Sequence, residues 1–463
     1  MATASQTAQN YVETFGQMVK SSRDREPFWL QTLRQRSFDR FSATGFPTTR
    51  DEDWRFTNIS AILQTNFQLN RNGHRLPTKQ QVESYRIAGV VCQLTFVDGR
   101  FVPQLSSPAA LPTGVTVASL AAQLASKPQQ VEPHLGRYLN TQRDPFAALN
   151  TAFLEDGGFV DIAKNTVLEE PIHLLFVSTA HEAPTMSHPR NLIVVEEGSH
   201  ATIIEEYVSL GGVEALCNTA TELIAGDSAV VSHYMIEREN VEAFNVSTLR
   251  MEESRNANIA SHSVLIGGAL VRNNVHPVLA GEGGECLING LFIGNGRQHL
   301  DNYMLVEHAQ PHCGSRQFYN GILDGSAHGV FHGRIIVHKN AQRTDAKQTN
   351  RNLLLSDQAQ IDTKPQLEIY ADDVKCTHGA TIGQIEENPL FYLRSRGIDE
   401  ASARRLLLLA FASECLGRMK EGPARNHVET LIHAQLLNLV NSSAGFNHAA
   451  YQTEGRRNLE EVG

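Results

Sequence analysis

Hydrophobic and polar positions change their period along the chain and divide it into three parts. A helical period dominates residues 1–85, in segments such as 11–20 and 26–41. Over residues 86–385, and most regularly from about residue 172, short runs of Val, Ile and Leu alternate with Gly, Asn and Asp turns, which indicates short β-strands. The helical period returns over residues 386–463. The sequence therefore predicts a mainly β core between an N-terminal and a C-terminal helical region.

Several of the short strands begin at a constant spacing. Ala201, Ala229 and Ala257 each open a strand after a short polar turn, and the 28-residue step continues to Glu285. Stacked coils of a β-helix give such a step because each coil travels the same perimeter. Hairpins of similar length in a sandwich or a barrel would give a similar pattern. The spacing alone leaves these architectures open.

The C-terminal region contains an unusually apolar helix. Asp399 is a suitable N-cap for a helix over residues 400–418. Its apolar residues lie most of the way round the helix and include Leu406, Leu407, Leu408, Leu409 and Phe411. Such a helix is buried on more than one side or binds a partner. A second helix is predicted over residues 427–440, followed by a polar tail, 441–463.

Composition and charge narrow the class of protein. The chain has 463 residues, of which 41% are hydrophobic and 19% charged, as in soluble globular proteins. Its net charge of −10 argues against nonspecific nucleic-acid binding. The longest apolar run, Leu406–Ala412, is far shorter than the roughly 20 residues of a membrane span. The polar first ten residues lack a signal-peptide core, so we expect a cytoplasmic protein or, if organellar, one of the plastid stroma.

Cys376 and His378 form the first candidate site. They lie two residues apart in a predicted strand, so their side chains point to the same face. A thiolate and an imidazole suit iron or zinc, but a cluster needs about four ligands, so the others must come from elsewhere, including another chain. Two further interpretations stay open: a buried cysteine beside an exposed histidine, and a nucleophilic cysteine with the histidine as its base.

A group of histidines forms the second candidate site. It comprises His299, His308, His312, Cys313, His328, His332 and His338. Stacked across coils, or arranged as in a cupin-like barrel, these residues would make a metal-dependent enzyme; as turn and surface residues they would bind nothing. No Gly-x-x-x-x-Gly-Lys-Ser/Thr motif occurs, so any use of ATP is expected to belong to another protein.

Long strings in the second half of the chain resemble a known family. They are Arg343–Ala346, Asn352–Ser356, Ile361–Ile369, Asp372–Thr381 and Tyr392–Ile398. These strings resemble the shared core of the SufB/SufD family of iron–sulfur cluster assembly scaffold proteins. Near the N-terminus, Gly45–Thr48 and Glu52–Arg55 resemble the SufD branch. No cysteine precedes Cys92, whereas the SufB branch carries additional N-terminal cysteines.

The resemblance implies a right-handed parallel β-helix between helical ends, in a scaffold that is not itself an enzyme. It implies pairing with a SufB-like paralogue through the β-helices, and a homodimer is plausible when that partner is absent. It also implies that His378 faces the paralogue and helps to bind a transient iron–sulfur cluster, with Cys376 as a second ligand or a supporting residue. The helix carrying Leu406–Phe411 is then the candidate docking region for a SufC-like ATPase, and this chain itself binds no nucleotide.

Overall fold

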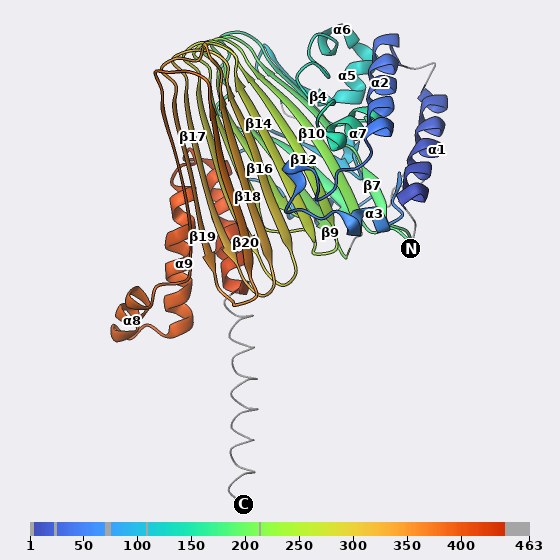
Figure 1. Cartoon of the computed structure of the whole chain (residues 1–463). Helices are drawn as coiled ribbons and strands as arrows, with labels where there is room; N and C mark the ends of the chain where they lie inside the picture. The colour runs from blue at the N-terminus through green and yellow to red at the C-terminus, as the bar shows by residue number, and fades with distance from the viewer. Residues whose placement is uncertain (1–3, 23–25, 70–75, 108–109, 213, 440–463) are drawn as a thin grey trace, which may run out of the picture.

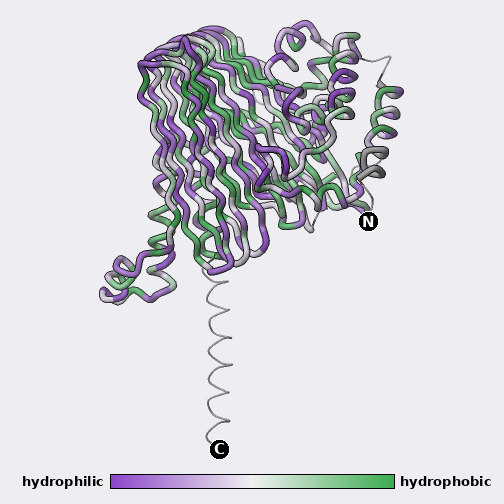
Figure 2. Tube along the Cα trace, viewed as in Figure 1, coloured by the Kyte–Doolittle hydropathy of each residue, from purple (hydrophilic) through white to green (hydrophobic). Residues whose placement is uncertain are grey.

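Two long sheets face each other in the computed structural model and form a parallel β-solenoid of about seven turns over residues 159–383. The structure describes residues 4–22, 26–69, 76–107, 110–212 and 214–439. Successive strands alternate between the two sheets, so each coil contributes one strand to each of them (Figure 1). Hydrophobic and hydrophilic positions alternate along the strands (Figure 2), because side chains point in turn to the space between the sheets, here called the lumen, and to the outer face.

Within the described residues, the first sheet has eleven strands and the second has ten. The first contains β20 (Gln360–Ile369), β18 (His328–Val337), β16 (His299–His308), β14 (Leu270–Leu279), β12 (Phe244–Glu253), β10 (Ala215–Ala225), β8 (Arg190–Val195), β5 (Gly158–Ile162) and β4 (Val115–Ser119), with β7 (Thr185–Ser187) and β1 (Gln68–Leu69) beside them. The second contains β21 (Lys375–Gly383), β19 (Asp345–Leu354), β17 (Gly314–Leu323), β15 (Glu285–Gly294), β13 (Asn258–Leu265), β11 (Val230–Arg238), β9 (His200–Leu210), β6 (Ile172–Thr179), β2 (Cys92–Val97) and β3 (Arg100–Phe101).

The coils repeat as predicted, but the number of residues from one coil to the next is not constant. The Cα partners His200, Val230, Asn258, Glu285 and Gly314 stand at successive steps of 30, 28, 27 and 29 residues. The predicted equivalence of Ala201 with Ala229 is therefore wrong, because Ala201 pairs with Val231. The corners between strands absorb the variable number of residues, while the strands keep their register.

One corner of each coil holds a residue with positive φ. Its backbone N–H donates to a carbonyl of the next coil, and this pattern recurs from Asn165 to Arg343. The residues are Asn165, Gly198, Ser228, Asn256, Gly283, His312 and Arg343, of which Gly198 and Gly283 pay no steric penalty for the left-handed conformation. His312 is thus explained as a corner residue of the fold.

The N-terminal helices cover the outer face of the first sheet over its early strands (Figure 1). They are α1 (Ala4–Ser22), α2 (Phe28–Thr44), α3 (Ser60–Gln64), α5 (Leu120–Ser126), α6 (Pro128–Val131) and α7 (Pro145–Phe153), with a 3-10 turn at Glu52–Trp54. Helix α4 (Lys79–Glu83) and a 3-10 turn at Pro103–Leu105 pack instead on the second sheet. Trp54 stacks on Phe146 of α7 at a centroid distance of 5.3 Å and lies 3.9 Å from the Arg272 guanidinium of β14. Helices α5 to α7 lie within residues 86–385, so helical structure extends beyond the sequence-based boundary at 85.

The C-terminal helices cover the outer face of the second sheet. They are α9 (Glu400–Leu416) and a helix over residues 423–439, whereas α8 (Glu387–Ser395) lies away from the sheets (Figure 1). The Asp399 carboxylate accepts the Ser402 N–H at 2.9 Å, which confirms the predicted N-cap. The last residue of the predicted second helix, Val440, and the predicted polar tail, 441–463, lie outside the described residues. None of the helices in the described ranges is both long and apolar enough to cross a bilayer.

Candidate functional site at the open end of the solenoid

Cys376 and His378 lie on β21, the last strand of the second sheet. β21 pairs with β19 on one side, and no described strand pairs with its other side. The Cα partners of the two residues are Ala346 and Gln348, both 1% exposed and both on the lumen side of β19. Cys376 and His378 therefore point toward the lumen at its open end, as expected for positions two apart on a strand.

The two side chains differ in exposure and chemistry. Cys376 is half-buried against the core, and burial raises the pKa of its thiol, with the charge of Asp345 acting in the same direction and the Ala346 N–H opposing both. The thiol is therefore protonated at neutral pH, and a metal ion would have to displace its proton. His378 is exposed, and the structure gives its imidazole no hydrogen bond or ion pair with a described residue.

The end of the solenoid is apolar as well as open. β20 and β21 form its terminal coil, and each has a paired neighbour on one side only in the described part of the chain. Large apolar side chains stand exposed on this coil: Ile369 to 39%, Tyr370 to 61% and Ile382 to 51%. Exposed edge strands of this length readily accept another strand. The coil thus combines two ligand-type side chains with a surface suited to a second chain.

The residues of the second candidate site do not form a single cluster. His299 and His328 are neighbours with ring centroids 4.8 Å apart, but His299 contacts the Thr57 hydroxyl and His328 contacts the Asp362 carboxylate. The other five are apart: His308 and Cys313 are buried and bonded to Ser315 and to backbone carbonyls, His332 contacts Gln366, His338 contacts Glu307, and His312 forms a corner. Burial lowers the pKa of His308 to about 4. Among the described residues, no three His, Cys, Asp or Glu side chains are arranged to hold a metal ion.

The apolar residues of α9 divide between two environments. Leu408 is 1% exposed and packs on the second sheet, and Leu409 and Phe411 are partly buried in the same cluster. Leu407 is half-buried, and Leu406 is 44% exposed. Most of the apolar residues that the sequence analysis assigned to partner binding therefore hold α9 on the solenoid. Asn320 and Asn289 of the second sheet also donate hydrogen bonds to carbonyls of α9.

The neighbouring helix α8 carries two aromatic residues that sequence reasoning did not single out. Phe391 is 73% exposed and Tyr392 is 57% exposed, and α8 projects away from the solenoid (Figure 1). Arg396 lies over the Tyr392 ring at 5.2 Å. The adjacent aromatics Phe391 and Tyr392, in a helix with little other exposed apolar surface, were the available signal in the sequence.

Comparison with known proteins agrees with this architecture. Residues 176–411 match the SufBD core domain of the SUF system for Fe–S cluster assembly, and residues 5–174 match the SufBD N-terminal region. The iron–sulfur cluster assembly protein SufD of Escherichia coli is 31% identical over 87% of this chain and 92% of its own. A SufBD family protein of Synechocystis is 34% identical over 84% and 87%, and a chloroplastic protein of Arabidopsis thaliana is 29% identical over 87% and 86%.

These matches span both the helical region and the solenoid, including the terminal coil that carries Cys376 and His378. The chain belongs to the SufBD family of iron–sulfur cluster assembly proteins.

Proposed function

We propose that this chain is a non-ATPase subunit of a SUF-type scaffold and works in the SufD role beside a SufB-like paralogue. The terminal coil pairs with the solenoid of the paralogue, and His378 and Cys376 contribute to binding a nascent iron–sulfur cluster at the interface. The cluster is cargo shared between the two chains, and the chain acts in the cytoplasm or, if organellar, in the plastid stroma.

The observation that carries this proposal is the position of the two residues on an unpaired, partly apolar terminal coil. Two side chains cannot complete the coordination of a cluster, which needs about four ligands. A second chain laid along β20 and β21 would supply the missing ligands and cover Ile369, Tyr370 and Ile382. In the absence of the paralogue, a second copy of this chain would cover the same surface as a homodimer.

The surface formed by the two helices α8 and α9 is the proposed docking surface for a SufC-like ATPase. Leu406, Phe391 and Tyr392 are exposed on these two helices, while Leu408 holds α9 on the second sheet. A partner bound here would transmit movement to the solenoid through α9. Leu407, Leu409 and Phe411 would then support the surface from its buried side.

The proposal is tested by expressing the chain together with the SufB-like and SufC-like proteins of the same organism and measuring iron and sulfide in the purified complex. His378→Ala should lower the cluster content severalfold without changing the subunit ratio, because one ligand is lost from the interface. Thr377→Ala, on the opposite face of β21, is the matched control and should keep the full content. Equal cluster content in the two variants would remove His378 from the proposal.

A further inference from the structure

Polar side chains form a row inside the lumen, where a solenoid core is expected to be apolar. One column of lumen-facing Cα partners in the second sheet reads His233, Ser261, Ile288, Gln317, Gln348 and His378. Five of these six residues are polar, and the first five are buried. The row runs from the middle of the solenoid to the terminal coil.

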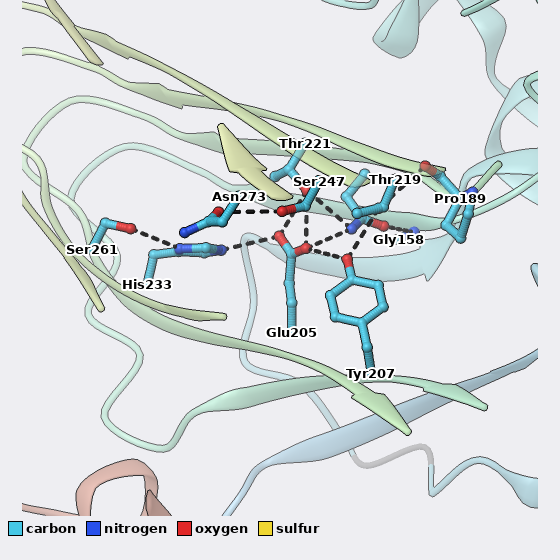
Figure 3. Close-up of polar contacts among 11 residues, drawn as sticks. Gly158, Pro189, Glu205, Tyr207, Thr219, Thr221, His233, Ser247, Ser261 and Asn273 are labelled. Carbon is cyan, nitrogen blue, oxygen red and sulfur yellow. Dashed lines mark hydrogen bonds and ion pairs between the residues drawn. The ribbon is translucent and has the colours of Figure 1, made fainter. Parts of the chain in front are cut away.

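The inner end of this row is a buried hydrogen-bond network around Glu205 and His233 (Figure 3). His233 Nε2 lies 3.1 Å from Glu205 Oε1, and His233 Nδ1 lies 3.1 Å from Ser261 Oγ. The Tyr207 hydroxyl donates to Glu205 at 2.7 Å, and Thr221 donates to it at 2.9 Å. Burial alone would raise the pKa of Glu205, but the hydrogen bond and charge of His233, with the two hydroxyl donors, outweigh it and lower that pKa.

Ile288 is the one apolar residue of this column. Polar lumen-facing side chains of the first sheet continue the row there. Asn273 Nδ2 donates to Ser263 Oγ at 2.9 Å, and the Cα partner of Asn273 is Asn302. Asn302 is 1% exposed, yet neither its amide nitrogen nor its amide oxygen has a hydrogen-bond partner in the described protein. A buried amide without partners destabilises the fold unless water satisfies it.

The outer part of the row also contains buried polar atoms without hydrogen-bond partners. Gln348 Nε2 donates to Gln317 Oε1 at 2.7 Å, which leaves Gln317 Nε2 and Gln348 Oε1 buried without partners. Gly333 of β18 makes room for this pair, since Gln348 Nε2 lies 1.9 Å from the place where a Cβ at position 333 would stand. Beyond Gln348 the column ends at the exposed His378.

We propose that the lumen holds a file of ordered water molecules that connects the buried Glu205–His233 pair with the open terminal coil at His378. The unpartnered amides of Asn302, Gln317 and Gln348 bind these waters, as buried polar groups in proteins usually do. Through the file, the Glu205–His233 pair exchanges protons with solvent although both side chains are buried. The inference rests on the lumen alone and is independent of the proposed function.

The other titratable groups near the inner pair are few and are themselves buried. Tyr207 and Cys217 face it from β9 and β10, and burial, together with the charge of His233, lowers the pKa of His262 of β13 to about 3. Glu237 and Glu239 lie farther along the lumen and act on Cys217. Burial favours the neutral form of each of these groups.

Exchange of the histidine C2 proton for deuterium, followed by mass spectrometry on the full chain, tests this proposal. His173 is an internal control: its Nε2 lies 3.1 Å from Glu206, the neighbour of Glu205 on the outer face of β9, and its side chain is equally buried. Gln348→Leu replaces a water-binding amide by an apolar side chain. It should slow exchange at His233 by about 10-fold and leave His173 unchanged, because only His233 is reached through the lumen.

A second variant and a control complete the test. Gly333→Ala adds a methyl group where Gln348 Nε2 now lies and should slow His233 in the same direction. Ile335→Leu changes the same strand at an apolar lumen position and should have no effect at either histidine. Unchanged exchange at His233 in both Gln348→Leu and Gly333→Ala, or equal slowing of His173, would overturn the proposal.

Discussion

The two ends of the solenoid differ in whether their edge strands are covered. At the N-terminal end, β5 pairs with antiparallel β4 and β2 pairs with antiparallel β3, and helices pack over the neighbouring face. At the C-terminal end, β20 and β21 have a neighbour on one side only in the described chain, and their residues are half-buried or exposed. Natural sheets generally cover or shorten their edges to avoid unwanted pairing. The open edge at β20 and β21 is the surface that the proposed paralogue would cover.

The same contrast is visible in two histidines of one lumen column. His233 in an inner coil is 1% exposed and paired with Glu205, whereas His378 in the terminal coil is exposed and without a described partner. Both project from equivalent positions of the repeat. The position in the stack, rather than the residue type, therefore decides which histidine is buried in a hydrogen-bond network and which is exposed.

The closed end should be far more sensitive to mutation than the open one. Phe96→Ala removes a side chain of β2 that is 0% exposed and stacked on Phe176, and it should lower the free energy of unfolding by about 3–5 kcal/mol. His378→Ala should change it by less than about 0.5 kcal/mol, because the side chain is exposed. Denaturant unfolding of both variants measures the difference. Similar losses at the two sites would contradict the division of roles between the ends.

The stability of the buried interior should also depend on pH. Burial, with the charge of neighbouring Glu239, holds the pKa of Glu237 well above its usual value, so Glu237 is neutral in the folded chain. The unfolded chain ionises near the ordinary pKa, so this contribution to stability is lost as pH rises toward the raised folded value.

Glu237→Gln keeps the neutral state and should therefore raise the thermal midpoint more at pH 8 than at pH 5. Thermal melts at the two pH values measure this difference. Glu285→Gln, at an exposed glutamate, is the control and should show no such pH-dependent gain. A gain that is equal at the two pH values would contradict the assignment.

Local signals in the sequence predicted much of the fold. The period change, the Asp399 N-cap and the coil repeat all follow from short-range rules that the structure obeys. The constant 28-residue step failed because corners such as that at His312 absorb extra residues without disturbing the strands. The short helix α7 was missed because its nine residues are almost all buried and show no polar face.

The candidate site was only partly predictable. The two-residue spacing of Cys376 and His378 predicted that their side chains share one face of a strand. Only the stacking of the coils shows that this strand lies at the open end of the solenoid. The apolar run in α9 gave no indication that Leu408 would be buried and Leu406 exposed, because that depends on how the helix sits on the second sheet. The lumen amides Gln317 and Gln348 look like surface residues in the sequence, and pairing across coils alone brings them together.

Backbone amide hydrogen exchange, measured on the free chain and on its complex with the SufB-like paralogue, tests the central claim most directly. The account predicts that residues 375–383 exchange quickly in the free chain and become strongly protected in the complex, because the paralogue pairs with the open edge of β21. Residues 92–97 at the closed end should be protected equally in both. Unchanged exchange over residues 375–383 in a complex that has formed would contradict the account.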